Sequence, residues 1–241
     1  MRAPRTTSAQ PPQMHRPTRT VHTVIVCLPD GTATANLRPW AIGAVLNRRI
    51  HHPFFTEGVV PHFAVRTRRT TKLVDCWQGL TSGGPVKLLD LDAMRRNAVA
   101  AAAAEWLLWD AVVKGTKPAQ PFWFYADRHR AEPGRYPLDR ARRDYLAQPR
   151  ILAMAAYNAI PRQPCPLPTS ALEAFQAGHT SYLNLAWLAA VPADVLAPEH
   201  GGYLSTGSER LADQLDYLRA ANAHLAGLRP DTPLVAVAVA A

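Results

Sequence analysis

The stretch VHTVIVCLPDG, residues 21–31, sets the fold class expected for this chain. Residues 21–28 form a β-branched run that is typical of a buried strand, and the Pro-Asp-Gly that follows is typical of a turn. Immediately downstream, Asn36 can cap a helix whose apolar residues keep a helical spacing as far as Ile50. A buried strand that turns directly into an amphipathic helix predicts a fold built from both kinds of element.

Further strand and helix signals continue to residue 135. A long helix is expected from Asp92, as its N-cap, to Val113, where a Lys-Gly pair ends it. Four more segments have strand patterns, and the first two of them are expected to form a hairpin or bent strand with a basic tip. These segments are 62–67, 72–77, 86–89 and 122–125.

The pattern becomes almost wholly helical after residue 135. Ser170 with Glu173, and Thr206 with Glu209, have the capping-box spacing that begins helices. Helices are expected at 139–148, 150–159, 171–177, 182–190 and 208–226. The predicted fold class is therefore α+β, with an N-terminal mixed β-sheet and two packed helices followed by a helical C-terminal part.

Four regions follow from this pattern. Residues 1–20 contain four Arg and no acidic residue, which predicts a flexible basic arm. The α+β region is expected over 21–135 and the helical region over 136–230. Residues 231–241 form an apolar C-terminal tail with alternating valines, which either adds an edge strand or hangs free.

Composition excludes several classes of protein. The chain has 241 residues, a formal net charge of +9 and 48% apolar residues, and its three cysteines are far apart. Fully disordered, collagen-like and disulfide-scaffold proteins are excluded, and reduced thiols are expected rather than a metal or redox site. The longest apolar run, 98–113, is interrupted by Glu105 and Asp110, which argues against a membrane span. We expect a cytoplasmic protein with no membrane partner.

The positive charge is concentrated toward the N-terminus. Residues 1–75, 76–150 and 151–241 carry formal charges of +8, +4 and −3. A basic front predicts contact with a polyanion, while the mildly acidic back is expected to pack or to meet protein. Of the 27 basic residues, 23 are Arg, a bias that genome composition alone could produce.

Two motifs resemble catalytic patterns, and both have simpler interpretations. The glycines from Gly79 to Gly84 have P-loop spacing, but Pro85 stands where the phosphate-binding Lys is required, which favours a plain turn. Asp90 and Asp92 follow an apolar run, as metal-binding carboxylates of some nucleases do, but Asp92 stands where a helix N-cap belongs and Asp90 where it would favour the dipole, so capping is the favoured explanation. The sequence therefore predicts no catalytic residue, no metal site and no cofactor.

Two basic constellations favour nucleic-acid binding. The first lies on the predicted hairpin, and the second is an aromatic run followed by arginines that continue to Arg143. Arginine can hold phosphates, and alternate aromatic rings on a strand could stack on bases. The candidate nucleic-acid-binding residues are Arg66, Arg68, Arg69, Lys72, Trp123, Tyr125, Arg128, Arg130 and Arg135.

The last predicted helix carries a narrow apolar stripe. It is either an internal packing face or a docking surface for a protein partner. The residues of this stripe are Leu211, Leu215, Leu218 and Leu225.

Three functions remain open at this stage. The leading hypothesis is a non-catalytic nucleic-acid-binding protein, with DNA or RNA as partner, that could be a subunit of a nucleoprotein assembly. The first alternative is a small metal-dependent nuclease or phosphotransferase that uses Asp90, Asp92 and Glu105 or Asp127. The second alternative is a protein-binding adaptor whose positive charge reflects composition alone.

Overall fold

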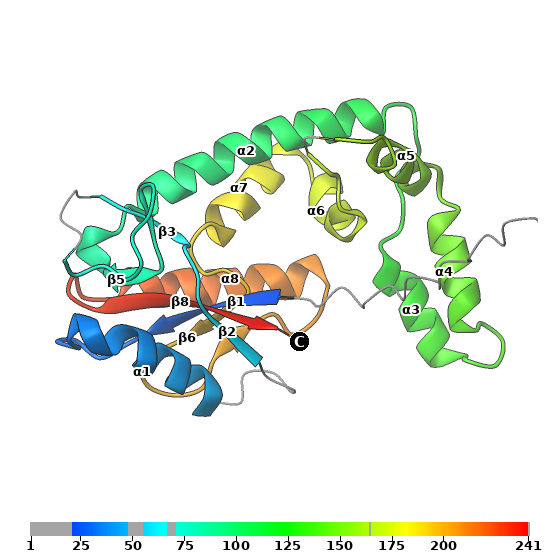
Figure 1. Cartoon of the computed structure of the whole chain (residues 1–241). Helices are drawn as coiled ribbons and strands as arrows, with labels where there is room; N and C mark the ends of the chain where they lie inside the picture. The colour runs from blue at the N-terminus through cyan, green and yellow to red at the C-terminus, as the bar shows by residue number, and fades with distance from the viewer. Residues whose placement is uncertain (1–20, 48–54, 67–70, 164, 241) are drawn as a thin grey trace, which may run out of the picture.

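The computed structural model describes residues 21–47, 55–66, 71–163 and 165–240 (Figure 1). Its main feature is a six-stranded mixed sheet in the order β2-β8-β1-β6-β7, with β5 pairing to β8 beside β2. The strands are β1 (Val21–Cys27), β2 (Phe55–Val59), β5 (Gly83–Pro85), β6 (Val195–Ala197), β7 (Leu204–Ser205) and β8 (Pro233–Ala240). The α+β class predicted from the sequence is confirmed.

The predicted first strand is confirmed as β1, and it lies in the middle of the sheet. It pairs parallel to β6, with Val24 opposite Val195, and antiparallel to β8, with Val24 opposite Val237. Both of its faces are covered, because Val24, Ile25 and Val26 have no exposed surface. A strand that is buried on both faces needs a continuous apolar run, which residues 24–28 supply.

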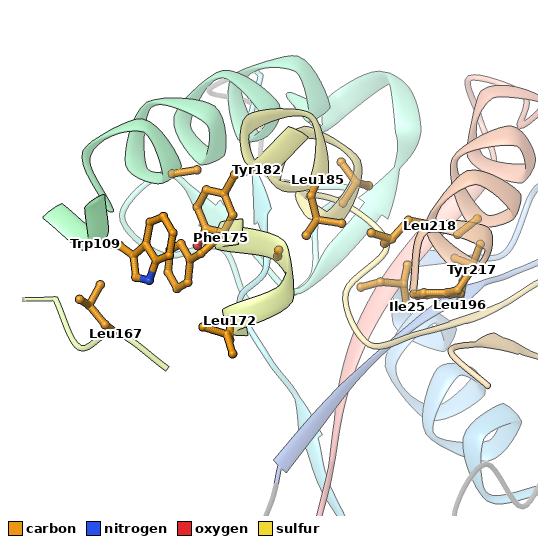
Figure 2. Packing of buried hydrophobic residues seen from close by; sticks show 14 of the residues in the cluster. Ile25, Trp109, Leu167, Leu172, Phe175, Tyr182, Leu185, Leu196, Tyr217 and Leu218 are labelled. Atoms are coloured by element: carbon orange, nitrogen blue, oxygen red, sulfur yellow. The ribbon is translucent and has the colours of Figure 1, made fainter. Parts of the chain in front are cut away.

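The two faces of the sheet pack against different helices. Helix α1 (Thr34–Asn47) buries Leu37, Ala41 and Val45 against the face that contains Val24 and Val237. Helix α8 (Leu211–Ala226) packs on the opposite face, which contains Ile25 and Leu196 (Figure 2). Because successive residues of a strand point to opposite faces, the one apolar run of β1 contributes side chains to the hydrophobic packing on both faces of the sheet.

Helices α2, α5, α6 and α7 extend the second core away from the sheet. Their bounds are α2 (Leu91–Val112), α5 (Pro149–Asn158), α6 (Leu172–Gln176) and α7 (His179–Ala189), with 3-10 turns η1 (Val86–Leu88) and η2 (Thr169–Ala171). Trp109, Phe175 and Tyr182 join α2, α6 and α7 through stacked rings (Figure 2). Trp109 and Val113 of this helix region are buried in the main core, whereas Leu107 is 61% exposed.

Helices α3 (Phe122–Ala131) and α4 (Leu138–Leu146) form a helical hairpin at the end of α2 that is remote from the sheet (Figure 1). The predicted strand at 122–125 is therefore wrong, because these residues form the first turn of α3. Phe122 and Tyr125 are three positions apart, and both rings contact Tyr145 of α4. A run of four aromatic residues suits a strand or a helix, and this i, i+3 contact is compatible only with the helix.

The predicted hairpin of 62–67 and 72–77 is also wrong. β3 (Phe63–Ala64) pairs instead with β4 (Leu80–Thr81), and 72–77 makes only isolated bridges. Asp75 has a φ of 45°, a left-handed conformation that interrupts an extended strand. The predicted strand at 86–89 is the 3-10 turn η1.

The C-terminal tail is an interior strand, not an edge strand or a free end. β8 pairs with β1 along one side and with β2 and β5 along the other. The glycine-rich loop belongs to this arrangement, because a Cβ at Gly83 would lie 2.2 Å from the Leu234 carbonyl oxygen. The P-loop-like spacing is therefore explained by the close approach of β5 to β8.

Candidate nucleic-acid interface

The hairpin of α3 and α4, residues 122–146, is called the arginine arm below. Its tip is built on Tyr136, whose side chain is 1% exposed. The Tyr136 hydroxyl donates a 2.7 Å hydrogen bond to Asp144, and its carbonyl oxygen lies 2.9 Å from Nδ1 of His129. Tyr136 therefore ties the turn between the helices to both of them.

Two arginine side chains lie against the Tyr136 ring. The guanidinium of Arg128 is 4.3 Å from the ring centroid, and that of Arg140 is 5.5 Å from it. A guanidinium that rests on an aromatic face keeps the N–H donors at its edge available, and those donors match phosphate oxygens. The arm thus presents two oriented cations at its tip.

The remaining arginines of the arm are exposed and differ in their partners. Arg130 pairs with Asp127 at 2.6 Å, and Arg142 lies 3.9 Å from Asp139. Arg135 and Arg143 make no ion pair with any residue in the described part of the chain. Exposed ion pairs contribute little free energy, so even the paired arginines can exchange a carboxylate for a phosphate.

The second half of the predicted site is remote from the arm. Arg66 and Lys72 are exposed beside the beginning of α2, where the Asp90 amide donates to the Ala64 carbonyl at 2.8 Å. Arg68 and Arg69 lie outside the described residues. α2 has 22 residues, which corresponds to about 33 Å, so the two constellations flank opposite ends of one helix and form no single patch.

The predicted base-stacking aromatics are engaged within the protein. Trp123 donates its Nε1–H to Glu173 at 3.0 Å, and its ring lies 4.8 Å from the Arg210 guanidinium. The Tyr125 ring packs against Tyr145. Phe124 is the more exposed aromatic of this helix, at 46%, and the sequence analysis did not single it out.

Tyr136 is the residue of the arm that the sequence analysis missed. Its role in orienting Arg128 and Arg140 depends on how α3 and α4 pack against each other. The only signal in the sequence is that this tyrosine lies within the run of arginines, between Arg128 and Arg140. Arg140 and Arg143 belong to the predicted arginine run but not to the predicted site. They are three positions apart on α4, so their side chains lie on the same face.

The carboxylates of the alternative enzyme hypothesis are dispersed. Asp90, not Asp92, is the N-cap of α2, and it accepts a 3.0 Å hydrogen bond from the Ala93 amide. Glu105 lies more than three turns further along α2, and Asp127 is on α3. Among the described residues, no three His, Cys, Asp or Glu side chains are grouped as metal ligands.

The predicted protein-docking stripe on α8 is largely internal. Leu218 and Leu225 are 1% and 6% exposed and belong to the main core, while Leu211 and Leu215 are half-buried beside it. Asn222, which lies between Leu218 and Leu225 on the same helix, donates 2.8 Å hydrogen bonds to the carbonyls of Leu188 and Leu218. The two leucines deepest in the stripe are therefore not available to another subunit.

Comparison of this chain with known protein families, with curated proteins and with solved structures finds no match in any of the three. No helix in the described part of the chain is both long enough and apolar enough to cross a membrane.

Proposed function

We propose that this chain binds nucleic acid through the arginine arm, as a non-catalytic component. The observation that carries the proposal is the pair of guanidinium groups, from Arg128 and Arg140, held against one buried Tyr136 ring at an exposed tip. Because these side chains are already held in place, less side-chain conformational entropy is lost when they bind a ligand. Arg135 and Arg143 add two exposed cations close to them in sequence.

This geometry favours contact with phosphates over contact with bases. The aromatic residues proposed for stacking are half-buried and hydrogen-bonded or packed within the protein. Arg128 and Arg140 are exposed, and the one ion pair of Arg140 in the described part of the chain is a 3.9 Å contact with Asp144. Phosphate contacts position a protein on nucleic acid without reading its sequence. The expected binding is therefore strong at low salt and nearly independent of base sequence.

The test is the salt dependence of binding to a duplex of defined length, followed by fluorescence anisotropy. Each phosphate contact on duplex DNA contributes a slope of about −0.9 in a plot of log affinity against log salt. Replacing both Arg135 and Arg143 with Ala should flatten the slope by nearly two units and weaken all sequences alike.

Arg219→Ala is the matched control, because Arg219 is an exposed arginine on α8 that lies 3.8 Å from Asp216. It removes one positive charge from the chain but none from the arm, and the slope should stay unchanged. If the control flattens the slope as much per charge as the arm variants do, or if the wild type binds neither DNA nor RNA at low salt, the proposal is wrong.

A further inference from the structure

A cavity of about 880 Å³ opens where the helices meet the sheet, and its charge is opposite to that of the whole chain. Residues from α3, α6, α7 and α8 form its walls, and the beginnings of β1 and β6 form its end. Its volume falls within the range of small-molecule sites, about 300 to 1,000 Å³. This space is called the acidic cleft below.

The acidic cleft contains three carboxylates, from Glu173, Asp194 and Glu209. Although the chain has 27 Lys and Arg against 18 Asp and Glu, none of the described residues that line the cleft is a Lys or an Arg. His22 is the one histidine of the described lining. The carboxylates therefore give the described lining a negative formal charge, which disfavours the phosphate groups that the arginine arm is proposed to bind.

Two of these carboxylates are held in fixed orientations. Oε2 of Glu173 accepts hydrogen bonds from Nε1 of Trp123 at 3.0 Å and from the Leu211 amide at 3.1 Å. Oδ2 of Asp194 accepts a 2.7 Å bond from the Thr23 amide. The second oxygen of Glu173, Oε1, has no hydrogen-bond partner in the described part of the chain. A carboxylate that is anchored through one oxygen and free at the other is prepared to accept a further donor.

The remaining walls are apolar and aromatic. Leu185 and Leu218 are buried at the inner side, and Tyr182 and Tyr217 come from the same two helices (Figure 2). The ring of Trp123 already lies against one cation, the Arg210 guanidinium, which shares the carboxylate of Asp127 with Arg130. Aromatic faces attract cations and apolar walls attract hydrocarbon, so the lining favours a molecule that carries both.

We infer that the acidic cleft binds an organic cation, an ammonium group attached to an aromatic or aliphatic body, with Glu173 as the principal charge partner. The ammonium group would meet the anchored carboxylates, and the body would pack against the leucine and tyrosine walls. This inference does not depend on the proposed function, because the cleft and the arm share no arginine and have opposite charge.

Three probes with one indole ring and different charge test the inference. Tryptamine is cationic, tryptophol is neutral and indole-3-acetate is anionic, and each is titrated into the full chain by isothermal titration calorimetry. Tryptamine should bind at least tenfold more tightly than tryptophol, since a hydrogen bond to a charged partner is worth about that factor. Indole-3-acetate should bind most weakly. Equal affinities of the three probes, or no binding of tryptamine at millimolar concentration, would overturn the inference.

Matched variants locate the site. Glu173→Gln keeps acceptors for the Trp123 and Leu211 donors but removes the charge, and it should weaken tryptamine about tenfold while leaving tryptophol unchanged. Glu209→Gln alters an exposed side chain without a hydrogen bond in the described part of the chain, so it should fold normally and weaken tryptamine less. Asp216→Asn removes a carboxylate of α8 outside the cleft and should have no effect. Unchanged tryptamine affinity in both cleft variants, or an equal loss in Asp216→Asn, contradicts the assignment.

A final variant addresses a competing occupant. Residues 1–20 contain four Arg and no acidic residue, and they precede His22 of the cleft lining in the sequence. If the inference holds, Arg16→Gln combined with Arg19→Gln leaves the tryptamine affinity of the full chain unchanged. If tryptamine binds only in this double variant, the chain's own basic segment is the occupant and the free organic cation is not.

Discussion

The indole ring of Trp109 lies parallel to the phenyl ring of Phe175, with an interplanar angle of 7° and 5.2 Å between ring centroids. On the other side of Phe175 the Tyr182 ring stacks at 4.6 Å, and the Tyr182 hydroxyl donates a 2.8 Å hydrogen bond to Glu105. These contacts join α2, α6 and α7 into one unit. The ring stack therefore holds the helices that support both the arginine arm and the acidic cleft.

Trp109→Ala should destabilise the protein by about 3 to 5 kcal/mol, because it leaves a large cavity beside Phe175. Trp109 is 4% exposed, whereas Leu107, two residues earlier on the same helix, is 61% exposed. Leu107→Ala is therefore a matched control that should change stability by less than about 1 kcal/mol. Urea unfolding followed by circular dichroism measures both, and similar losses in the two variants would show that the stack is not part of the core.

Gly83→Ala should destabilise the sheet, since the added Cβ would lie 2.2 Å from the Leu234 carbonyl oxygen and 2.8 Å from Cα of Val235. Overpacking of this kind typically costs about 1 to 3 kcal/mol. A Cβ at Gly207 meets no atom within 4 Å, so Gly207→Ala should be close to neutral. Thermal unfolding of the two variants is the measurement. Equal melting temperatures would show that β5 can move away from β8 at little cost.

The N-cap of α2 provides a third prediction. Asp90→Ala should cost about 1 kcal/mol, while Asp90→Asn should be nearly neutral, because Asn caps a helix as well as Asp does. Asp92 lies in the first turn but does not cap the helix, so Asp92→Ala should lose only a few tenths of a kcal/mol through the helix dipole. Chemical unfolding distinguishes the two positions. A larger loss at Asp92 than at Asp90 would reverse the assignment of the cap.

His62 should make the protein less stable in mild acid. Burial lowers the pKa of His62 below 6.5, and the Val191 carbonyl that accepts from Nε2 and the charge of Asp194 offset this only in part. Below pH 6.5 the unfolded chain binds a proton that the folded chain resists, so stability is retained above that pH and lost as pH falls. The loss for this one group cannot exceed about 1.4 kcal/mol per pH unit.

The measurement is urea unfolding between pH 7.5 and pH 5. His62→Gln, which keeps a donor for Val191, should show a shallower pH dependence than the wild type. His200→Gln is the control, because the His200 side chain is 91% exposed, and it should follow the wild type closely. A His62→Gln variant with an unchanged pH dependence would contradict the prediction.

Variants of Tyr136 test whether nucleic-acid binding depends on the orientation of the arginines in the arm, because they leave the number of arginines unchanged. Tyr136→Leu removes the ring that holds Arg128 and Arg140 and should weaken nucleic-acid binding by about 1 to 3 kcal/mol, the entropy of ordering two long side chains. Because the number of cations is unchanged, the salt slope should change little. Tyr136→Phe keeps the ring and loses only the bond to Asp144, so its affinity should stay near that of the wild type.

The sequence predicts local features well and their combination poorly. The apolar run of β1 and the spacing in α2 specify those elements without help from the rest of the chain. The aromatic run at 122–125 has no period of its own, and its contact with Tyr145 makes it a helix. The interior position of β8 depends on pairing with strands that lie between 148 and 219 residues earlier in the chain, which no local pattern encodes.

In the candidate sites, too, the sequence predicts single residues but not the contacts that bring them together. Arg128, Arg130 and Arg135 stand out in the sequence as basic residues, but the buried ring of Tyr136 that orients Arg128 depends on how α3 meets α4. The acidic cleft was not predicted at all. Glu173, Asp194 and Glu209 come from separate segments, and each carboxylate alone resembles an ordinary surface residue.

The interior position of β8 has a consequence for biosynthesis. β1 leaves the ribosome before β8, and the antiparallel partner of Val24 is absent until Val237, 213 residues further along the chain, has been translated. At about 5 to 20 residues per second this delay is roughly 10 to 40 seconds, during which the apolar run of residues 24–28 has no strand beside it on that edge. A nascent chain of this protein should therefore require a chaperone more than its size suggests, and a chain truncated before β8 should be prone to aggregate.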